Sequence, residues 1–145
     1  MAVNKNVKVM ATGKEKFLIE LKAGDFTAYI DQPEAMGGDN SAPTPLHYFE
    51  WALAGCIVTI GKIVAKQQRI DLRGLTCSVE GGLNTAVLMG KSDEDRPGFQ
   101  NFKLVVNVDA DMTEEEKKAF VEEVDARCPI SDNIHGQTPI EFVIE

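Results

Sequence analysis

The uncharged segment Trp51–Val58 is the feature that most limits how this chain can fold. Thr44 and Pro45 predict the start of a helix, since a hydroxyl can cap free N–H groups and proline suits the first turn. The helix is expected to run from about residue 44 to about residue 68. Because its middle has no polar face, it must be enclosed on all sides. In a chain of 145 residues, that requires sheets on both sides of the helix or a second subunit.

Three strands are predicted ahead of the helix, within about residues 4–31, because apolar and polar side chains alternate there. Their inward sets are Val7, Val9 and Ala11, then Phe17, Ile19 and Leu21, and then Phe26, Ala28 and Ile30. Turn sequences at Thr12–Lys14 and Ala23–Asp25 separate the strands, which favours an antiparallel meander.

Further strands are predicted within about residues 73–110, with a polar loop between them at about 90–98. A second helix is predicted over about residues 113–127, because Thr113 and Glu116 have the spacing of a capping box. Sheets and helices in this order indicate an α+β fold rather than a parallel nucleotide-binding fold.

The end of the chain predicts a short turn, Ser131 to His135, and then a last strand over about residues 138–144. Ile140, Phe142 and Ile144 are expected to face inward. No internal repeat or low-complexity linker is visible, so residues 1–145 are interpreted as a single domain.

Composition excludes several classes of partner. A net charge of −8, with no cluster of Lys or Arg, argues against a nucleic-acid partner. The longest apolar stretch, Trp51–Ile60, ends before Lys62, short of the roughly 20 residues that span a bilayer. Residues 1–11 have no apolar core like that of a signal peptide. We therefore expect a cytoplasmic protein with no membrane partner.

The three cysteines, Cys56, Cys77 and Cys128, are the residues that could carry chemistry. Their odd number and wide spacing do not fit a secreted disulfide framework, and there is no CxxC pair. Cys77 falls on the inward face of a predicted strand and is interpreted as core. Cys128 follows Arg127 at a helix end, where a cation can favour the thiolate. From the residues alone, a working Cys56–Cys128 pair and two inert buried thiols are both open.

Two motifs together change this balance. The stretch Gly37–Pro45, followed by Leu53-Ala54-Gly55-Cys56, resembles the signature of the OsmC/Ohr family of thiol peroxidases. The segment Arg127–Asn133, with its Cys-Pro-Ile-Ser sequence, resembles the second cysteine motif of that family. The order of predicted elements also matches, from about residue 4 to residue 144.

The resemblance implies an OsmC-like fold in which two subunits form an intertwined homodimer. Antiparallel sheets from both subunits would wrap two long central helices. It also implies a Cys-based peroxidase for organic hydroperoxides, in oxidative stress defence, that needs no metal or cofactor. Cys56 matches the peroxidatic cysteine, which becomes a sulfenic acid, and Cys128 matches the resolving cysteine, which forms a disulfide with it. An external thiol reductant would reset the pair.

The sequence departs from the family pattern at two positions. The family pairs its peroxidatic thiolate with an arginine from the N-terminal strands, but the first arginine here is Arg69. The family also has a glutamate just after the proline of the helix start, whereas Pro45 is followed by Leu46. The nearest glutamate, Glu50, falls on a different helix face from Cys56. Replacement cations could be Arg73, Arg127, Lys14, Lys16 or a protonated His47.

Two other functions are therefore considered. A non-catalytic member of the same fold could bind a small apolar ligand or an electrophile in the dimer cleft. A metal site made of Cys56, Cys128, His47 and His135 would suit zinc, although the two histidines lack ligand-like spacing.

Overall fold

The structure is a computed structural model that describes residues 2–145; Met1, the first residue of the predicted single domain, lies outside the described residues. The chain divides into two compact units, one up to Phe49 and the other Glu50–Glu145. Both sheets are antiparallel, as expected for an α+β fold.

The first unit contains the predicted three-stranded meander. Its strands are β1 (Met10–Gly13), β2 (Ile19–Ala23) and β3 (Phe26–Ile30), in the order β1-β2-β3. The first strand begins later than predicted, at Met10 rather than near residue 4, because pairing with β2 begins where Met10 lies opposite Lys22. A 3-10 turn, η1 (Glu34–Met36), follows.

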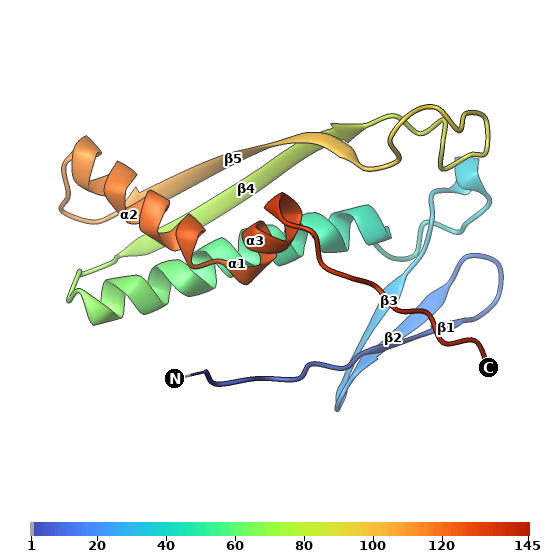
Figure 1. The fold of residues 1–145 in the computed structure, drawn as a ribbon, viewed down its shortest axis with the longest axis horizontal. Helices are drawn as coiled ribbons and strands as arrows, with labels where there is room; N and C mark the ends of the chain where they lie inside the picture. The colour runs from blue at the N-terminus through green and yellow to red at the C-terminus, as the bar shows by residue number, and fades with distance from the viewer. Residues whose placement is uncertain (1) are drawn as a thin grey trace. The chain divides into compact units, whose positions relative to one another are not determined.

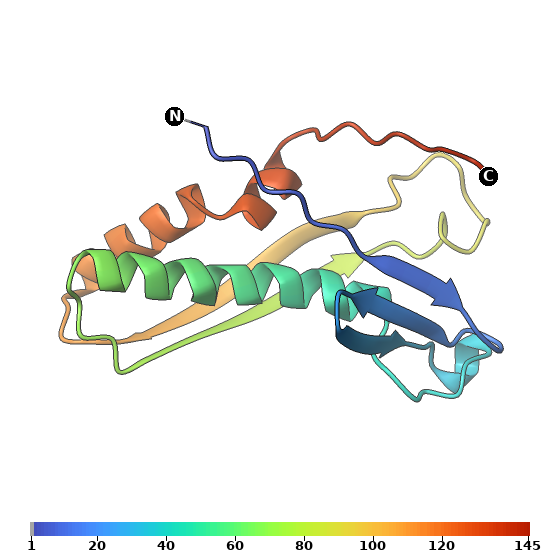
Figure 2. The same ribbon diagram turned by 90° about the horizontal axis from the view of Figure 1, so that it is seen from below.

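The second unit is built on a long two-stranded ribbon of β4 (Gly74–Leu83) and β5 (Phe99–Asp109). Helix α1 (Pro45–Gln67) runs along this ribbon, and α2 (Glu114–Ala126) and α3 (Pro129–His135) lie beside it (Figures 1 and 2). The predicted capping box is confirmed, since the Thr113 hydroxyl accepts from the Glu116 N–H at 3.1 Å and the Glu116 side chain accepts from the Thr113 N–H.

The core of this unit is formed by one face of α1 together with β5, α2 and the turn before α3. Its buried residues are Leu53, Ile57, Val64, Ala65, Val108, Ala110, Phe120, Val124 and Cys128. Gly61 allows the close contact with β4, because a Cβ at this position would lie 2.4 Å from Leu75 Cδ2. The spacing of the buried helix residues is that of a single face of an α-helix.

The rest of α1 is not covered within the single chain, so one chain does not provide the all-round enclosure that its sequence predicts. Within the single chain, Trp51 is 57% exposed, and Phe49 and Ile63 are also exposed. By length and composition alone, α1 is the one helix among residues 2–145 that could cross a membrane. The apolar stretch Trp51–Ile60, which was counted in the sequence, is only the shorter part within it. Its buried face packs in the core of the unit, as the central helix of a globular domain does.

The C-terminal region differs from the sequence prediction in two places. Residues 131–135, predicted as a turn, belong to helix α3, because Cys128 caps this helix and Pro129 occupies its first turn. The predicted last strand, about 138–144, is not formed in this chain. Ile140, Phe142 and Ile144 are exposed rather than inward, because an alternating pattern produces a strand only where an edge is available for pairing.

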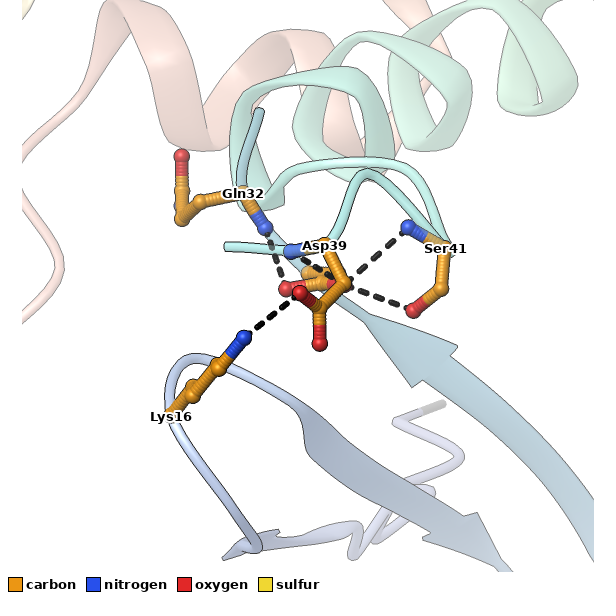
Figure 3. A network of polar contacts seen from close by, with 5 residues as sticks. Lys16, Gln32, Asp39 and Ser41 are labelled. Carbon is orange, nitrogen blue, oxygen red and sulfur yellow. Dashed lines mark hydrogen bonds and ion pairs between the residues drawn. The ribbon is translucent and has the colours of Figure 1, made fainter. Parts of the chain in front are cut away.

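Asp31 organises the loop that leads from β3 toward α1. Figure 3 labels its partners Gln32, Asp39 and Ser41. Its carboxylate is 2% exposed and accepts three backbone N–H groups, from Gln32 at 2.8 Å, Asp39 at 3.3 Å and Ser41 at 3.0 Å. The Ser41 hydroxyl donates a fourth bond at 2.6 Å. These donors, the two from Ser41 first, lower the pKa of Asp31 to about 2. Asp39 of this loop also forms an exposed ion pair, at 2.7 Å, with Lys16 from the connection between β1 and β2.

We expect Asp31→Asn to lower the stability of the protein at pH 7, because an amide cannot accept all four bonds. The pKa of Asp31 is lowered on folding, so its contribution is present above about pH 4 and is lost as pH falls through about 2. Urea midpoints between pH 7 and pH 2 should therefore converge for wild type and variant at the acid end. Asp39→Asn is the control and should change little, because it removes only an exposed ion pair. Equal midpoints for wild type and Asp31→Asn at pH 7 would contradict this role.

Candidate active site: a pair of thiols

Cys56 lies near the middle of α1, between the core residues Leu53 and Ile57 along the chain. Its side chain is half-buried and packs against the core cluster. Cys128 lies in the turn between α2 and α3 and is 1% exposed. The two cysteines that the sequence nominated therefore belong to the same core, although they come from elements 72 residues apart in number.

The two thiols are neighbours in this core. The Cys128 side chain is among the groups that act on the Cys56 thiol, and so is the backbone N–H of Ile130, in the first turn of α3. Because a helix face and a helix start supply the two sulfurs, neither depends on a long exposed loop for its position.

Cys128 is held by contacts within its own turn. Its Sγ accepts from the Ser131 N–H at 3.4 Å, and its own N–H donates to the Asp125 carbonyl at 3.1 Å. The Ser131 hydroxyl donates to Asp125 Oδ1 at 2.6 Å. The sulfur is thus the N-cap of α3, a position that is normally occupied by a side-chain oxygen.

The surroundings of Cys56 disfavour its thiolate. Burial raises the pKa of Cys56, and the neighbouring Cys128 raises it further, whereas the Ile130 N–H lowers it. A thiol in this setting is mostly protonated at neutral pH. Only a thiolate attacks peroxides rapidly, so the pKa of Cys56 limits the chemistry of the pair.

No cationic side chain of residues 2–145 is among the groups that act on the Cys56 thiol. Arg73 is paired with Asp109 at 3.0 Å and Asp111 at 3.2 Å. Arg127 is paired with Glu123 at 3.6 Å and with the Gln67 side chain at 3.0 Å. The two arginines proposed as replacements therefore have carboxylate partners within the second unit.

Lys16 and His47, two further candidates, have partners in the first unit. Lys16 pairs with Asp39, as described above. His47 Nδ1 accepts from the Thr44 N–H at 3.0 Å, so the histidine ring contributes to the helix start.

Cys77 lies on β4, opposite Val106, with its side chain on the face that packs against the core. Burial is the main cause that raises the pKa of Cys77, and the neighbouring Cys128 raises it further. Its interpretation as a core residue is consistent with this position, but it is also an electrostatic neighbour of the resolving candidate.

The metal alternative gains no support. Across the part of the chain that the structure describes, no three side chains of His, Cys, Asp or Glu are grouped so that they could hold a metal ion. The structure therefore does not assemble Cys56, Cys128, His47 and His135 into a zinc site.

The family of the chain follows from comparison with known proteins. The model of the family described as OsmC-like protein matches residues 38–143, which is well over half of the chain. The chain therefore belongs to the OsmC-like family. No curated protein sequence matches it.

Solved structures show the same fold. The chain is similar to an OsmC-like protein from Mycoplasma pneumoniae, with a TM-score of 0.81, 20% identity, and coverage of 93% of this chain and 91% of that chain. It is also similar to an organic hydroperoxide resistance protein OsmC from Legionella pneumophila, with a TM-score of 0.67, 22% identity and 93% coverage of each chain. A third similar structure is the organic hydroperoxide resistance protein OhrB of Bacillus subtilis, with a TM-score of 0.62, 24% identity, and coverage of 92% and 93%.

Sequence patterns did not identify the groups that surround the two sulfurs. Ser131 follows Cys128 by three residues and Pro129 lies between them, which is the spacing of an N-cap and the third residue of a helix. That spacing could have indicated the Ser131 N–H contact. The Asp125 carboxylate and the Ile130 N–H could not have been identified, because both depend on the angle between α2 and α3.

We expect Cys56 to react with iodoacetamide more slowly at pH 7 than a cysteine in an unfolded peptide. The pH midpoint of its alkylation should lie above that of the peptide, because burial raises the pKa of Cys56. Peptide mass spectrometry after timed alkylation measures both quantities, with a Cys56 peptide cut from the same protein as the reference. A midpoint at or below the peptide value would contradict an environment in which burial acts on Cys56 without a compensating cation.

Proposed function

We propose that the chain is a Cys-based peroxidase that reduces organic hydroperoxides, with Cys56 as the peroxidatic residue and Cys128 as the resolving residue. The observation that carries the proposal is that Cys128 acts directly on the Cys56 thiol in one core, and both residues lie within the range that the family model matches. Their sequence surroundings resemble the two cysteine motifs of the family. The names of the Legionella and Bacillus relatives support the substrate class.

In the proposed reaction, the Cys56 thiolate attacks the distal oxygen of the hydroperoxide and the O–O bond breaks. An alcohol leaves after taking up a proton, and Cys56 becomes a sulfenic acid. The Cys128 sulfur then attacks Cys56 Sγ, a disulfide forms and water leaves. An external thiol reductant restores both thiols by exchange. Such a reductant is available in the cytoplasm, where we place the protein.

We further propose that residues 1–145 form a single OsmC-like domain that acts as an intertwined homodimer. Large apolar side chains that α1 leaves exposed in the single chain, among them Phe49, Trp51 and Ile63, support this assembly, because exposed apolar surface can mark an interaction site. The exposed apolar side chains of residues 140–144 support it as well. A second subunit would supply the cover that the sequence of α1 requires, and it could bring a cation to Cys56.

One specific observation favours a second candidate function. Cys56 is partly exposed and has a raised pKa, with no cation acting on it in the described chain. A protein of this kind could bind a small apolar ligand or an electrophile at the thiol pair without turning over peroxide.

Addition of one equivalent of cumene hydroperoxide should convert Cys56 and Cys128 to a disulfide, visible by intact mass and peptide mapping. Cys56→Ser should reduce peroxide consumption to the uncatalysed rate, because it removes the thiolate that attacks the hydroperoxide. Cys128→Ser should retain a single turnover and leave a sulfenic acid. Cys77→Ser is the matched control and should consume peroxide like wild type.

Thiols that stay reduced under excess hydroperoxide would contradict the peroxidase. In that case, a small apolar molecule retained in native mass spectra and lost in Cys56→Ser would support the binding function.

The dimer predicts a specific effect of Gly55→Glu. Gly55 is exposed on α1, and a Cβ there would meet nothing within 4 Å in the single chain. A charged side chain should therefore be harmless to the monomer but should split a dimer packed through this helix. Sedimentation velocity should show a dimer for wild type and for the control Gly82→Glu, another open position, and a monomer for Gly55→Glu. A wild-type monomer, or a Gly55→Glu dimer of unchanged affinity, would contradict the assembly.

A further inference from the structure

We propose that Asp125 and Ser131 are positioning residues that hold the turn carrying Cys128 against Cys56. The inference rests on the proposed function, because it assigns a role in closing the Cys56–Cys128 disulfide. Neither residue was predicted as a site residue from the sequence, although Ser131 lies within the second cysteine motif.

Asp125 closes the turn at two points. Its backbone carbonyl accepts the Cys128 N–H at 3.1 Å, and its carboxylate accepts the Ser131 hydroxyl at 2.6 Å. Ser131 is 6% exposed, so its hydroxyl has exchanged water for a single carboxylate partner. A hydrogen bond to a charged acceptor is stronger than one between neutral groups, and burial of its donor makes its loss costly. The last turn of α2 and the first turn of α3 are therefore fixed to each other around Cys128.

The fixed turn presents two neighbouring backbone donors to the two sulfurs. The Ser131 N–H donates to Cys128 Sγ at 3.4 Å, and the neighbouring Ile130 N–H acts on Cys56, where it lowers the pKa of the thiol. Cys128 itself is the titratable side chain that faces Cys56, and Cys77 faces Cys128 from β4. Because no cationic side chain of the described residues acts on Cys56, these peptide groups are the donors that remain at the pair.

Positioning matters for the resolving step, because Cys128 must approach Cys56 Sγ along the axis of the bond that breaks. A turn that shifts by about 1 Å leaves the sulfurs in the same core but out of line. Misplacement of this size is enough to slow an intramolecular reaction by a large factor.

Closure can be measured without any hydroperoxide. An aromatic disulfide with a coloured thiolate leaving group first forms a mixed disulfide with Cys56, and releases one thiolate. Cys128 then attacks Cys56 Sγ, the Cys56–Cys128 disulfide forms and the second aromatic thiolate is released in a first-order phase. All variants carry Cys77→Ser as well, so that the third thiol does not add to the measured release of aromatic thiolate.

Ser131→Ala and Asp125→Ala should each slow the second phase about tenfold or more. The double variant should be no slower than either single variant, because both substitutions remove the same hydrogen bond. Ser131→Thr and Asp125→Asn should close the disulfide nearly as fast as the parent protein. A threonine hydroxyl and an asparagine oxygen can both keep the hydrogen bond between positions 131 and 125. Thr138→Ala is the matched control: it removes a side-chain bond to Asn133 at the other end of α3, and it should close like wild type.

The pH profile separates positioning from simple stabilisation. Loss of the hydrogen bond between Ser131 and Asp125 should move the pH midpoint of Cys56 alkylation upward. The reason is that the Ile130 N–H lowers the pKa of Cys56 in the intact turn. Wild-type closure rates in both single variants, or strictly additive effects in the double variant, would overturn the proposal. A protein that closes its disulfide but ignores hydroperoxide would overturn the peroxidase and leave the positioning role intact.

Discussion

The placement of Cys56 beside Cys128 is the feature of this structure on which the proposed function depends. It exists because one face of α1 packs in the same core as α2 and the turn before α3. Gly61 allows the helix to approach β4 closely, and Leu53 and Ile57 set the rotation that brings Cys56 to the edge of the core. A sulfur on a helix and a sulfur at a helix start are thereby placed together without a flexible loop.

The same packing creates an electrostatic difficulty. Burial raises the pKa of Cys56, and no cation of the described residues acts on this thiol. Arg73 and Arg127, two of the candidate cations, are paired with carboxylates. Backbone N–H groups are the donors that the fold supplies instead. They carry no net charge, so they offset only part of the cost of ionising a buried thiol. If the chain is a peroxidase, as proposed, either its reaction is slow or a second subunit supplies a cation to Cys56. The apolar side chains that α1 leaves exposed in the single chain are where we propose that such a subunit packs.

Local signals in the sequence predicted much of this structure. The meander, the central helix and the capping box at Thr113 follow from alternation, apolar length and cap chemistry, which act over a few residues. The pairing of Cys56 with Cys128 came from family motifs, since spacing alone left it open. The positions of Asp125 and the Ile130 N–H were out of reach, because they depend on how α2 meets α3. The final segment was predicted as a strand from alternation, but a strand also requires a pairing edge, which a pattern cannot supply.

The central claim is that the two sulfurs lie within bridging distance. Oxidation of the reduced protein with diamide, which requires no peroxide chemistry, tests this most directly when followed by intact mass and disulfide mapping. We predict that the protein loses two hydrogens per chain and that Cys56 is linked to Cys128 within one chain, while Cys77 remains a free thiol. A protein that stays fully reduced, or one that links only Cys77 or cysteines of different chains, would contradict the account.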